Sequence, residues 1–191
     1  MRVIAGKYRS RPLRSLRGMD IRPTSDRLRE TLFNVLTAGR PEALAGSVWL
    51  DLFAGTGAVG IEALSRGAHA VYFVDSSPRA AAVIRENLRT LGIGDGFEIH
   101  EREVQRTLPL LDSRAVEPGY VFLDPPYRRR QAYDATLGLL SQSRLLRPGS
   151  VVIAEHEKKF DPGERCGALQ RYRLLQQGDA ALSFYRLAND S

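Results

Sequence analysis

Short apolar runs alternate with stretches of helical periodicity from Val48 to Glu155, and this alternation restricts the chain to few folds. Strands are predicted at 48–53, 70–75, 97–100, 119–123 and 150–155, with helices at 58–66, 78–91, 104–111 and 131–143 between them. Such an order predicts a mostly parallel α/β sheet with helices on both faces. Two further runs, 172–175 and 181–187, predict a final antiparallel pair. Ligands of these sheets bind at the carboxyl ends of the strands.

A glycine-rich loop follows the first of these strands. The run from Asp51 to Gly60 has the pattern G-x-G-x-x-G and opens a helix, but that pattern alone also occurs in dinucleotide sites. Asp51 would repel a pyrophosphate and suits the ammonium of a methionine moiety. Asp75 ends the next strand and can accept both hydroxyls of a ribose. The two acids together favour S-adenosylmethionine over NAD as the cofactor.

A rigid acidic turn follows the strand at 119–123. Asp124-Pro125-Pro126-Tyr127 combines a carboxylate, two residues with fixed φ and an aromatic ring. The carboxylate and the proline carbonyls can accept hydrogens from an exocyclic amino group, and the ring can stack on a base. Tetrapeptides of this form resemble motif IV of the amino-methyltransferases. Arg128, Arg129 and Arg130 come next and could hold phosphates beside the target base, although an exposed, solvated triplet is an open alternative.

Positive charge is concentrated at the N-terminus. Residues 1–30 contain nine Arg or Lys and three acids, whereas the remainder has 19 of each sign, so this segment holds the whole net charge of +6. A basic arm of this kind attracts polyanions. We therefore expect RNA contacts, with a solubilising tail as the alternative. The candidates within the arm are Arg2, Lys7, Arg9, Arg11 and Arg14.

Composition sets further limits. The 191 residues suffice for one domain with a small appendage, without a signal peptide or membrane span, and a cytoplasmic protein is expected. The single Cys166 rules out an internal disulfide, and the three histidines are scattered, so no metal site is predicted. Trp49 and Phe122 lie inside apolar strands and are assigned to the core.

Taken together, the chain closely resembles the RsmD family of bacterial methyltransferases that modify guanine N2 in 16S ribosomal RNA. The resemblance rests on residues 1–9, on the distinctive segment from Arg22 to Asn34, on Leu50 to Gly57, on Asp124 to Tyr127, and on Gly178 to Tyr185. Gln177, Ala180 and Glu103 depart from the family pattern. The departures weaken expectations about adenine contacts and about the C-terminal edge, but not the family assignment.

The resemblance implies a class I S-adenosylmethionine-dependent methyltransferase fold, Rossmann-like, with a mostly parallel seven-stranded sheet and an antiparallel final strand. Residues 1–21 would form the basic arm or hairpin and 22–191 the methyltransferase domain. The implied partner is 16S ribosomal RNA in a partly assembled small subunit, and a monomer is expected. The cofactor set is Asp51, Phe53, Ala54, Gly55, Thr56, Gly57, Asp75, Ser76 and Glu103, with Glu101 as the alternative to Glu103; the catalytic set is Asp124, Pro125, Pro126 and Tyr127.

Other functions are compatible with the sequence. Adenine-N6 methyltransferases and glutamine-N5 methyltransferases of proteins use similar turns, and the basic arm argues against the protein substrate. A vestigial RNA-binding assembly factor and a nicotinamide oxidoreductase are the alternatives from other classes. Arg29 and Asn34 could close over cofactor or RNA, or could serve only helix packing.

Overall fold

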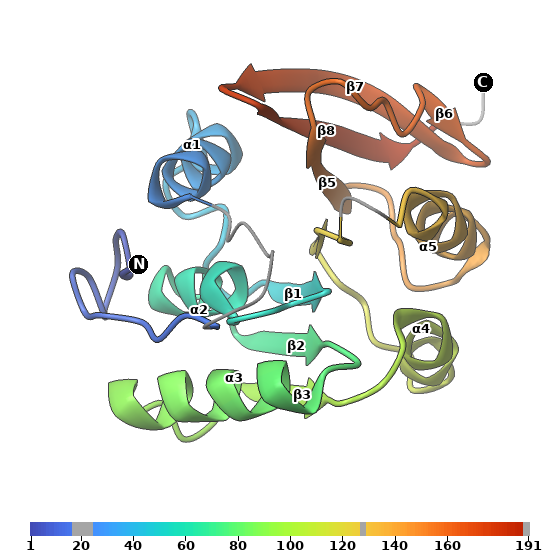
Figure 1. Cartoon of the computed structure of the whole chain (residues 1–191). Helices are drawn as coiled ribbons and strands as arrows, with labels where there is room; N and C mark the ends of the chain where they lie inside the picture. The colour runs from blue at the N-terminus through green and yellow to red at the C-terminus, as the bar shows by residue number, and fades with distance from the viewer. Residues whose placement is uncertain (17–24, 127–128, 189–191) are drawn as a thin grey trace.

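The computed structural model describes residues 1–16, 25–126 and 129–188, and its centre is an eight-stranded sheet. The strand order is β3-β2-β1-β4-β5-β8-β7-β6 (Figure 1). The strands are β1 (Val48–Leu52), β2 (Ala70–Val74), β3 (Phe97–His100), β4 (Tyr120–Leu123), β5 (Val151–Glu157), β6 (Arg165–Cys166), β7 (Leu169–Gln177) and β8 (Ala180–Leu187). Strands β1 to β5 are parallel, and β6, β7 and β8 are antiparallel.

The predicted mostly parallel sheet with an antiparallel end is confirmed. The sequence predicted seven strands, and the eighth is the two-residue edge strand β6. It pairs only Arg165 with Gln170 and Cys166 with Leu169. A strand this short carries no alternation of apolar and polar residues, so it leaves no signal in the sequence.

Five helices in the described part of the chain cover the two faces of the sheet. They are α1 (Asp26–Thr37), α2 (Ala58–Ser65), α3 (Pro78–Leu91), α4 (Val104–Ser113) and α5 (Gln131–Gln142). One hydrophobic cluster joins α1, α2 and α3 to the sheet, and a second joins α4 and α5 to its other face (Figure 1). Trp49 and Phe122 are buried in the first cluster, as predicted.

Helix α3 has the bounds that the sequence predicted, because signals mark both of its ends. The Ser77 side chain caps the helix by accepting a hydrogen bond from the Ala80 N–H, and Pro78 occupies the first turn, where no donor is needed. Gly92 ends the helix with φ of 71°, a left-handed conformation that glycine adopts without steric cost.

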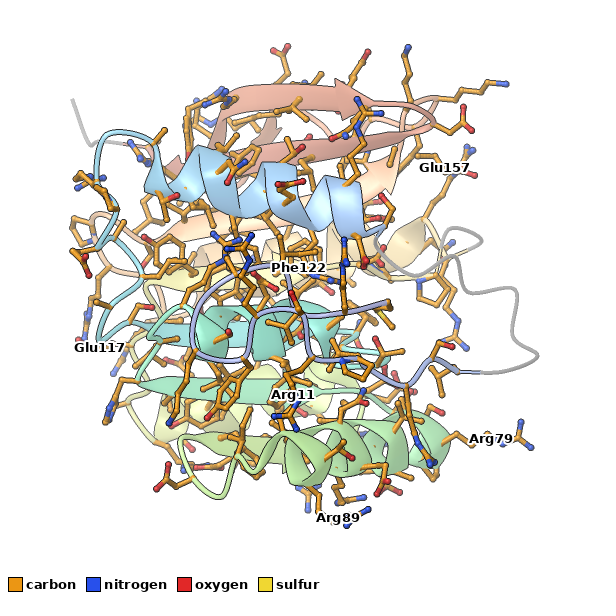
Figure 2. The ribbon with its side chains drawn as sticks, turned by 90° about the vertical axis from the view of Figure 1, so that its left-hand side faces the viewer. Arg11, Arg79, Arg89, Glu117, Phe122 and Glu157 are labelled. Carbon is orange, nitrogen blue, oxygen red and sulfur yellow. The ribbon has the colours of Figure 1, made fainter. Side chains whose placement is uncertain are left out.

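The N-terminal arm is docked against α2. Buried Glu62 on α2 accepts hydrogen bonds from the backbone N–H groups of Ile4 (2.7 Å) and Ala5 (3.0 Å). Figure 2 shows the arm crossing in front of α2, and Arg11 donates to the carbonyl of Thr90 on α3. A bridge between Arg2 and Pro12 closes the arm on itself, which agrees with the predicted arm or hairpin over residues 1–16; the remainder of the predicted arm lies outside the described residues.

Buried Asn87 of α3 joins the arm to the glycine loop. Its side-chain amide pairs with the backbone of Arg14 at 2.7 Å and 3.2 Å, and it also donates to the carbonyl of Thr56 at 3.0 Å. The arm is therefore an integral part of the face that supports the loop. No helix in the described part of the chain combines the length and the apolarity needed to cross a membrane.

Candidate active site

The glycine loop between β1 and α2 is held in shape by the end of β2. Gly55 and Gly57 have φ of 55° and 74°, and Phe53 has φ of 61°. The Gly55 N–H donates to Asp75 Oδ2 at 2.9 Å. A Cβ on Gly55 would meet only the Phe53 carbonyl oxygen, at 3.9 Å, so the space beside Gly55 is open. The backbone is therefore open at Gly55, as the sequence predicted. A Cβ on Gly57 would instead meet Ile84 at 3.1 Å and Phe73 at 3.2 Å, so Gly57 allows close packing of the loop on the core.

Asp51 lies beneath this loop. Its side chain is buried at 2 % exposure, and its Oδ2 accepts a hydrogen bond from the Gly60 N–H at 2.8 Å. The pKa of Asp51 is raised to about 8, mainly because burial removes hydration from the carboxylate. The hydrogen bond from Gly60 opposes this shift, and the charge of Asp75 adds to it. The carboxyl group therefore holds a proton at neutral pH unless a cation approaches it.

Asp75 is oriented by two backbone donors, since Oδ2 accepts from Gly55 and Oδ1 accepts from the Ser77 N–H at 2.8 Å. Each carboxylate oxygen has a second acceptor position, so both can still accept from a ligand hydroxyl. Ser76 is exposed beside it. The loop residues Ala54 and Thr56 lie within the same turn, where the Ala54 N–H donates to the Val74 carbonyl at 3.0 Å.

The two acids after β3 have different surroundings. Glu101 lies 3.6 Å from the guanidinium of Arg85. Glu103 is the exposed N-cap of α4, and its side chain makes no hydrogen bond to the first turn. Because Glu101 already has a cationic partner, Glu103 is the better placed of the two to receive a new hydrogen bond.

Asp124 ends the strand next to that of Asp51. Strands β1 and β4 are parallel neighbours, and the Asp124 N–H donates to the Leu52 carbonyl at 3.3 Å. The glycine loop and the acidic turn therefore share one edge of the sheet, as the sequence predicted. Asp124 is partly exposed, Pro125 is buried and Pro126 is exposed. The predicted Tyr127 and Arg128 lie outside the described residues.

A third acid, Glu155, belongs to this edge and was not predicted. It lies on β5, next to β4, and is buried at 2 % exposure. Loss of hydration is the largest cause that raises the pKa of Asp124, followed by the charges of Glu155 and Asp51. The rule that identified the other acids, a carboxylate at the carboxyl end of a predicted strand, would also have identified Glu155.

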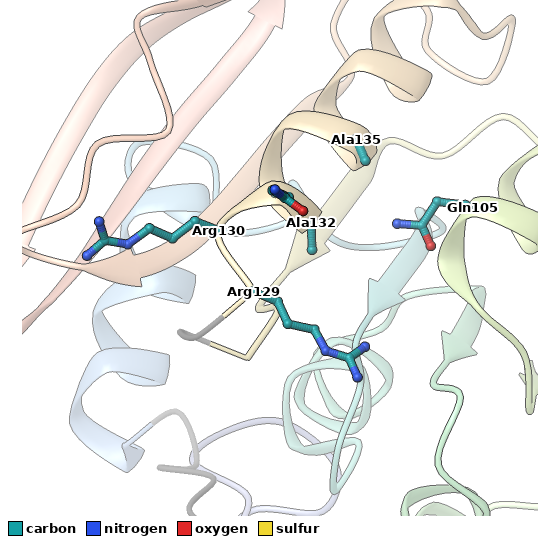
Figure 3. Close-up of a pocket in the computed structure, with 6 residues that line it drawn as sticks. Gln105, Arg129, Arg130, Ala132 and Ala135 are labelled. Atoms are coloured by element: carbon teal, nitrogen blue, oxygen red, sulfur yellow. The ribbon is translucent and has the colours of Figure 1, made fainter.

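A cavity of about 690 Å³ opens between α4 and α5 beside the acidic turn (Figure 3). Its volume lies in the range of small-molecule and nucleotide pockets. The lining residues are Gln105, Arg129, Arg130, Gln131, Ala132 and Ala135. Figure 3 shows Arg129 and Arg130 leaving the loop in opposite directions, and the Arg130 guanidinium lies 5.1 Å from the centre of the Phe160 ring. Arg129 has no comparable contact with an aromatic ring among the described residues.

The other basic candidates divide into exposed and buried groups. Arg2, Lys7, Arg9, Arg11 and Arg14 are exposed. Arg29, by contrast, is fully buried, donates to the Arg2 carbonyl and to Asp26, and lies 3.8 Å from Glu62. Arg29 therefore serves the packing of α1 against the arm and α2, which was one of the two predicted roles. Asn34 is exposed on the same helix.

Within residues 1–16, 25–126 and 129–188, no group of three or more His, Cys, Asp or Glu side chains is arranged to hold a metal ion. The chemistry available at this edge comes from carboxyl groups, backbone amides and guanidinium groups. These groups suit a ligand that carries hydroxyls and a positive charge. They also suit a second molecule that donates hydrogen bonds to the carboxyl groups.

Comparison with known proteins agrees with this geometry. The family model described as "Conserved hypothetical protein 95" matches residues 1–186. Ribosomal RNA small subunit methyltransferase D of Haemophilus influenzae is 38% identical over 98% of this chain and 92% of its own length. The protein of the same name from Escherichia coli is 32% identical over 82% of this chain and 75% of its own.

A solved structure, a hypothetical protein of Thermus thermophilus, superposes with a TM-score of 0.83 at 28% identity, covering 98% of this chain and 99% of that one. The fold is that of the class I methyltransferases, with a mostly parallel sheet and an antiparallel edge. The match over nearly the whole chain and the relatives above 30% identity show that this chain belongs to the RsmD family.

Proposed function

We propose that this protein transfers a methyl group from S-adenosylmethionine to the exocyclic N2 amine of a guanine in small-subunit (16S) ribosomal RNA. The observation that carries the proposal is the shared edge of β1, β2 and β4, where the glycine loop, Asp75 and Asp124 meet. The names of the relatives support ribosomal RNA as the substrate. A partly assembled small subunit in the cytoplasm is the proposed target, and the protein is proposed to act as a monomer.

The residues of the glycine loop fit this cofactor. The open space at Gly55 admits a ligand close to the backbone, and Asp75 has free acceptor positions for the two ribose hydroxyls. Asp51 would accept from the methionine ammonium, whose charge would favour the ionised carboxylate over the protonated form. Phe53, Ala54, Thr56, Gly57, Ser76 and Glu103 complete the proposed cofactor set. The bound sulfonium supplies an activated methyl group, so no metal is needed.

Asp124 and the following prolines would hold the acceptor. The guanine N2 lone pair is delocalised into the ring, so the amine must be turned and pyramidalised before it can react. The Asp124 carboxylate and a carbonyl of Pro125 or Pro126 would accept the two N2 hydrogens. Tyr127 is proposed to stack on the base. The target base must be unpaired or turned out of its stack to enter the site.

Alignment is proposed as the main source of rate acceleration. Holding two reactants in line can contribute about 7–11 kcal/mol. Proton abstraction by a positioned base contributes typically about 10²–10⁴-fold. After transfer, the methylated amine is acidic, and Asp124 could accept its proton at that stage. The raised pKa of Asp124 improves its ability to keep that proton.

The RNA would lie across the arm and the acidic turn. Within the proposed arm, residues 1–21, the phosphate contacts would come from Arg2, Lys7, Arg9, Arg11 and Arg14, all of which are exposed. Residues 22–191 would form the methyltransferase domain. Arg129 at the cavity and its neighbours Arg128 and Arg130 would hold phosphates beside the target base. The cavity between α4 and α5 has room for a nucleotide next to it.

Isothermal titration calorimetry with S-adenosylmethionine, followed by methyl transfer from labelled cofactor to small subunits from a deletion strain, tests the proposal. Binding heat and label incorporation into RNA are expected. A vestigial assembly factor would give no heat, and a nicotinamide enzyme would give heat with NAD only. Label in protein instead of RNA would favour a glutamine methyltransferase, and label in adenosine would favour an adenine-N6 enzyme.

A further inference from the structure

The exposed large apolar side chains of the described residues are both on one strand. Tyr172 is 45% exposed and Leu174 is 43% exposed, and both lie on β7. Strand β7 pairs with β8 on one side and with only two residues of β6 on the other. Tyrosine is enriched in binding surfaces, and an exposed ring can serve as a stacking platform.

A β-bulge sets the direction of Tyr172. The pairing of β7 with β8 shifts between Arg171 and Arg173, so Tyr172 is the additional residue. Its ring lies 6.2 Å from that of Phe184, a residue of the cluster under α1, and the Arg186 guanidinium lies 4.3 Å from the centre of the Tyr172 ring. Bulges re-aim side chains in this way and are common next to functional sites.

Arginines without acidic partners surround this ring. Arg173 and Arg186 are exposed and form no ion pair with a described carboxylate, in contrast to Arg171, which binds Asp161 at 2.6 Å. Arg173 follows Tyr172 directly on β7, and Arg186 lies on the neighbouring strand β8, opposite Gln170. We call the group of Tyr172, Arg173 and Arg186 the β7 platform.

We propose that the β7 platform is a second RNA-docking surface, which binds an unpaired nucleotide and its phosphates away from the target guanine. A base can stack on the exposed Tyr172–Arg186 pair, because aromatic rings and guanidinium planes both stack on bases. Arg173, which is exposed next to the ring in sequence, supplies further positive charge for the adjoining phosphates. This inference rests on the proposed RNA substrate, and it adds a contact that neither the arm nor the acidic turn provides.

The platform is too far from Asp124 to take part in the reaction. Tyr172 lies near the level of Val152 and Val121, three strand spacings from β4. With about 4.8 Å between strands and about 3.3 Å per residue, the separation from Asp124 is roughly 15–20 Å. A surface at that distance can select a folded RNA, because it and the active site must be contacted together.

The test measures binding of a small-subunit ribosomal RNA transcript and of undermethylated small subunits at several salt concentrations. Tyr172→Ala is expected to weaken both about 5-fold or more, because stacking contributes about 1–3 kcal/mol per base. The double variant R173A/R186A is expected to lower the slope of log affinity against log salt by about 1.4, at about 0.7 per phosphate on a single strand. Tyr172→Phe keeps the ring and should bind like wild type.

Arg144→Ala is the matched control, since Arg144 is exposed and its guanidinium has no ion pair with a described carboxylate. All variants should bind S-adenosylmethionine as wild type does. Wild-type affinity and salt slope in both Y172A and R173A/R186A would overturn the platform. Loss of binding to assembled subunits alone, with the transcript unaffected, would also overturn it and indicate a ribosomal protein. Failure of wild type to methylate RNA would instead contradict the proposed function, whatever the variants bind.

Discussion

Asp51 and Asp124 lie at the carboxyl ends of neighbouring parallel strands, Asp51 as the penultimate residue of β1 and Asp124 directly after β4, yet the structure gives them different surroundings. Asp51 is covered by the glycine loop and accepts a hydrogen bond from Gly60. Asp124 is partly exposed and lies close to the charge of Glu155. Burial raises the pKa of both acids, but Asp124 keeps partial exposure whereas Asp51 is buried. Two acids at one edge of the sheet therefore differ in exposure, which agrees with the proposed roles of Asp51 at the cofactor and Asp124 at the acceptor.

Asp124→Ala is expected to give the largest effect. Methyl transfer should fall by at least about 100-fold, because both the alignment of N2 and a proton acceptor are removed. Calorimetric affinity for S-adenosylmethionine and the melting temperature should stay at wild-type values. Single-turnover methyl transfer measures the loss, and wild-type turnover in this variant would remove Asp124 from the mechanism.

Asp51→Asn should affect binding of the cofactor more than transfer. Loss of a charge-assisted hydrogen bond to the ammonium corresponds to about 1.5–3 kcal/mol, or about 10- to 150-fold in affinity. In wild type, binding near pH 7 should also release a proton from Asp51, whose pKa is about 8. Calorimetry in buffers of different ionisation enthalpy measures that proton, and its absence would place the ammonium elsewhere.

The same variant should change how stability depends on pH. Folded Asp51 keeps its proton up to about pH 8, whereas the unfolded side chain loses it near pH 4. The folded form therefore binds more protons in this window, and wild-type stability should fall as pH rises through it. Asp51→Asn should reduce that fall in denaturant melts at pH 5 and pH 8. An equal slope in both proteins would show that Asp51 ionises normally in the folded state.

Glu155→Gln is expected to shift the pH profile of transfer. In the proposed mechanism the ionised form of Asp124 accepts the N2 hydrogens, so activity should fall as pH drops through its raised pKa. Removing the charge of Glu155 should lower the pKa of Asp124, so the fall in activity should occur at lower pH than in wild type. Glu157→Gln, on the same strand, is the control. If the pH at which activity falls shifts equally in both variants, Glu155 has no specific role.

Replacing Arg9, Arg11 and Arg14 with alanine should have the smallest effect on the chemistry. The Michaelis constant for RNA should rise and its salt dependence should flatten, while single-turnover transfer at saturating RNA stays unchanged. Arg11 already donates to Thr90, and Arg14 lies 3.9 Å from Glu86, so part of their charge is engaged within the protein. An unchanged salt slope would show that the arm does not touch phosphate.

The features that the sequence predicted correctly are those that depend on residues close together in the chain. The bounds of α3 follow from Ser77, Pro78 and Gly92, and the shared edge of the two acids follows from their positions at strand ends. The docking of the arm could not be predicted, because it depends on Glu62, a residue that looks like an ordinary surface acid of α2 in the sequence. The β7 bulge likewise depends on pairing between strands and not on composition.

Nucleoside mass spectrometry of small-subunit ribosomal RNA from a deletion strain, after incubation of its subunits with this protein and S-adenosylmethionine, tests the shared-edge mechanism most directly. One additional N2-methylguanosine per subunit is expected with wild type and almost none with Asp124→Ala. Methyl groups on another base, or the same yield with both proteins, would contradict a site in which Asp124 presents a guanine amine to the cofactor.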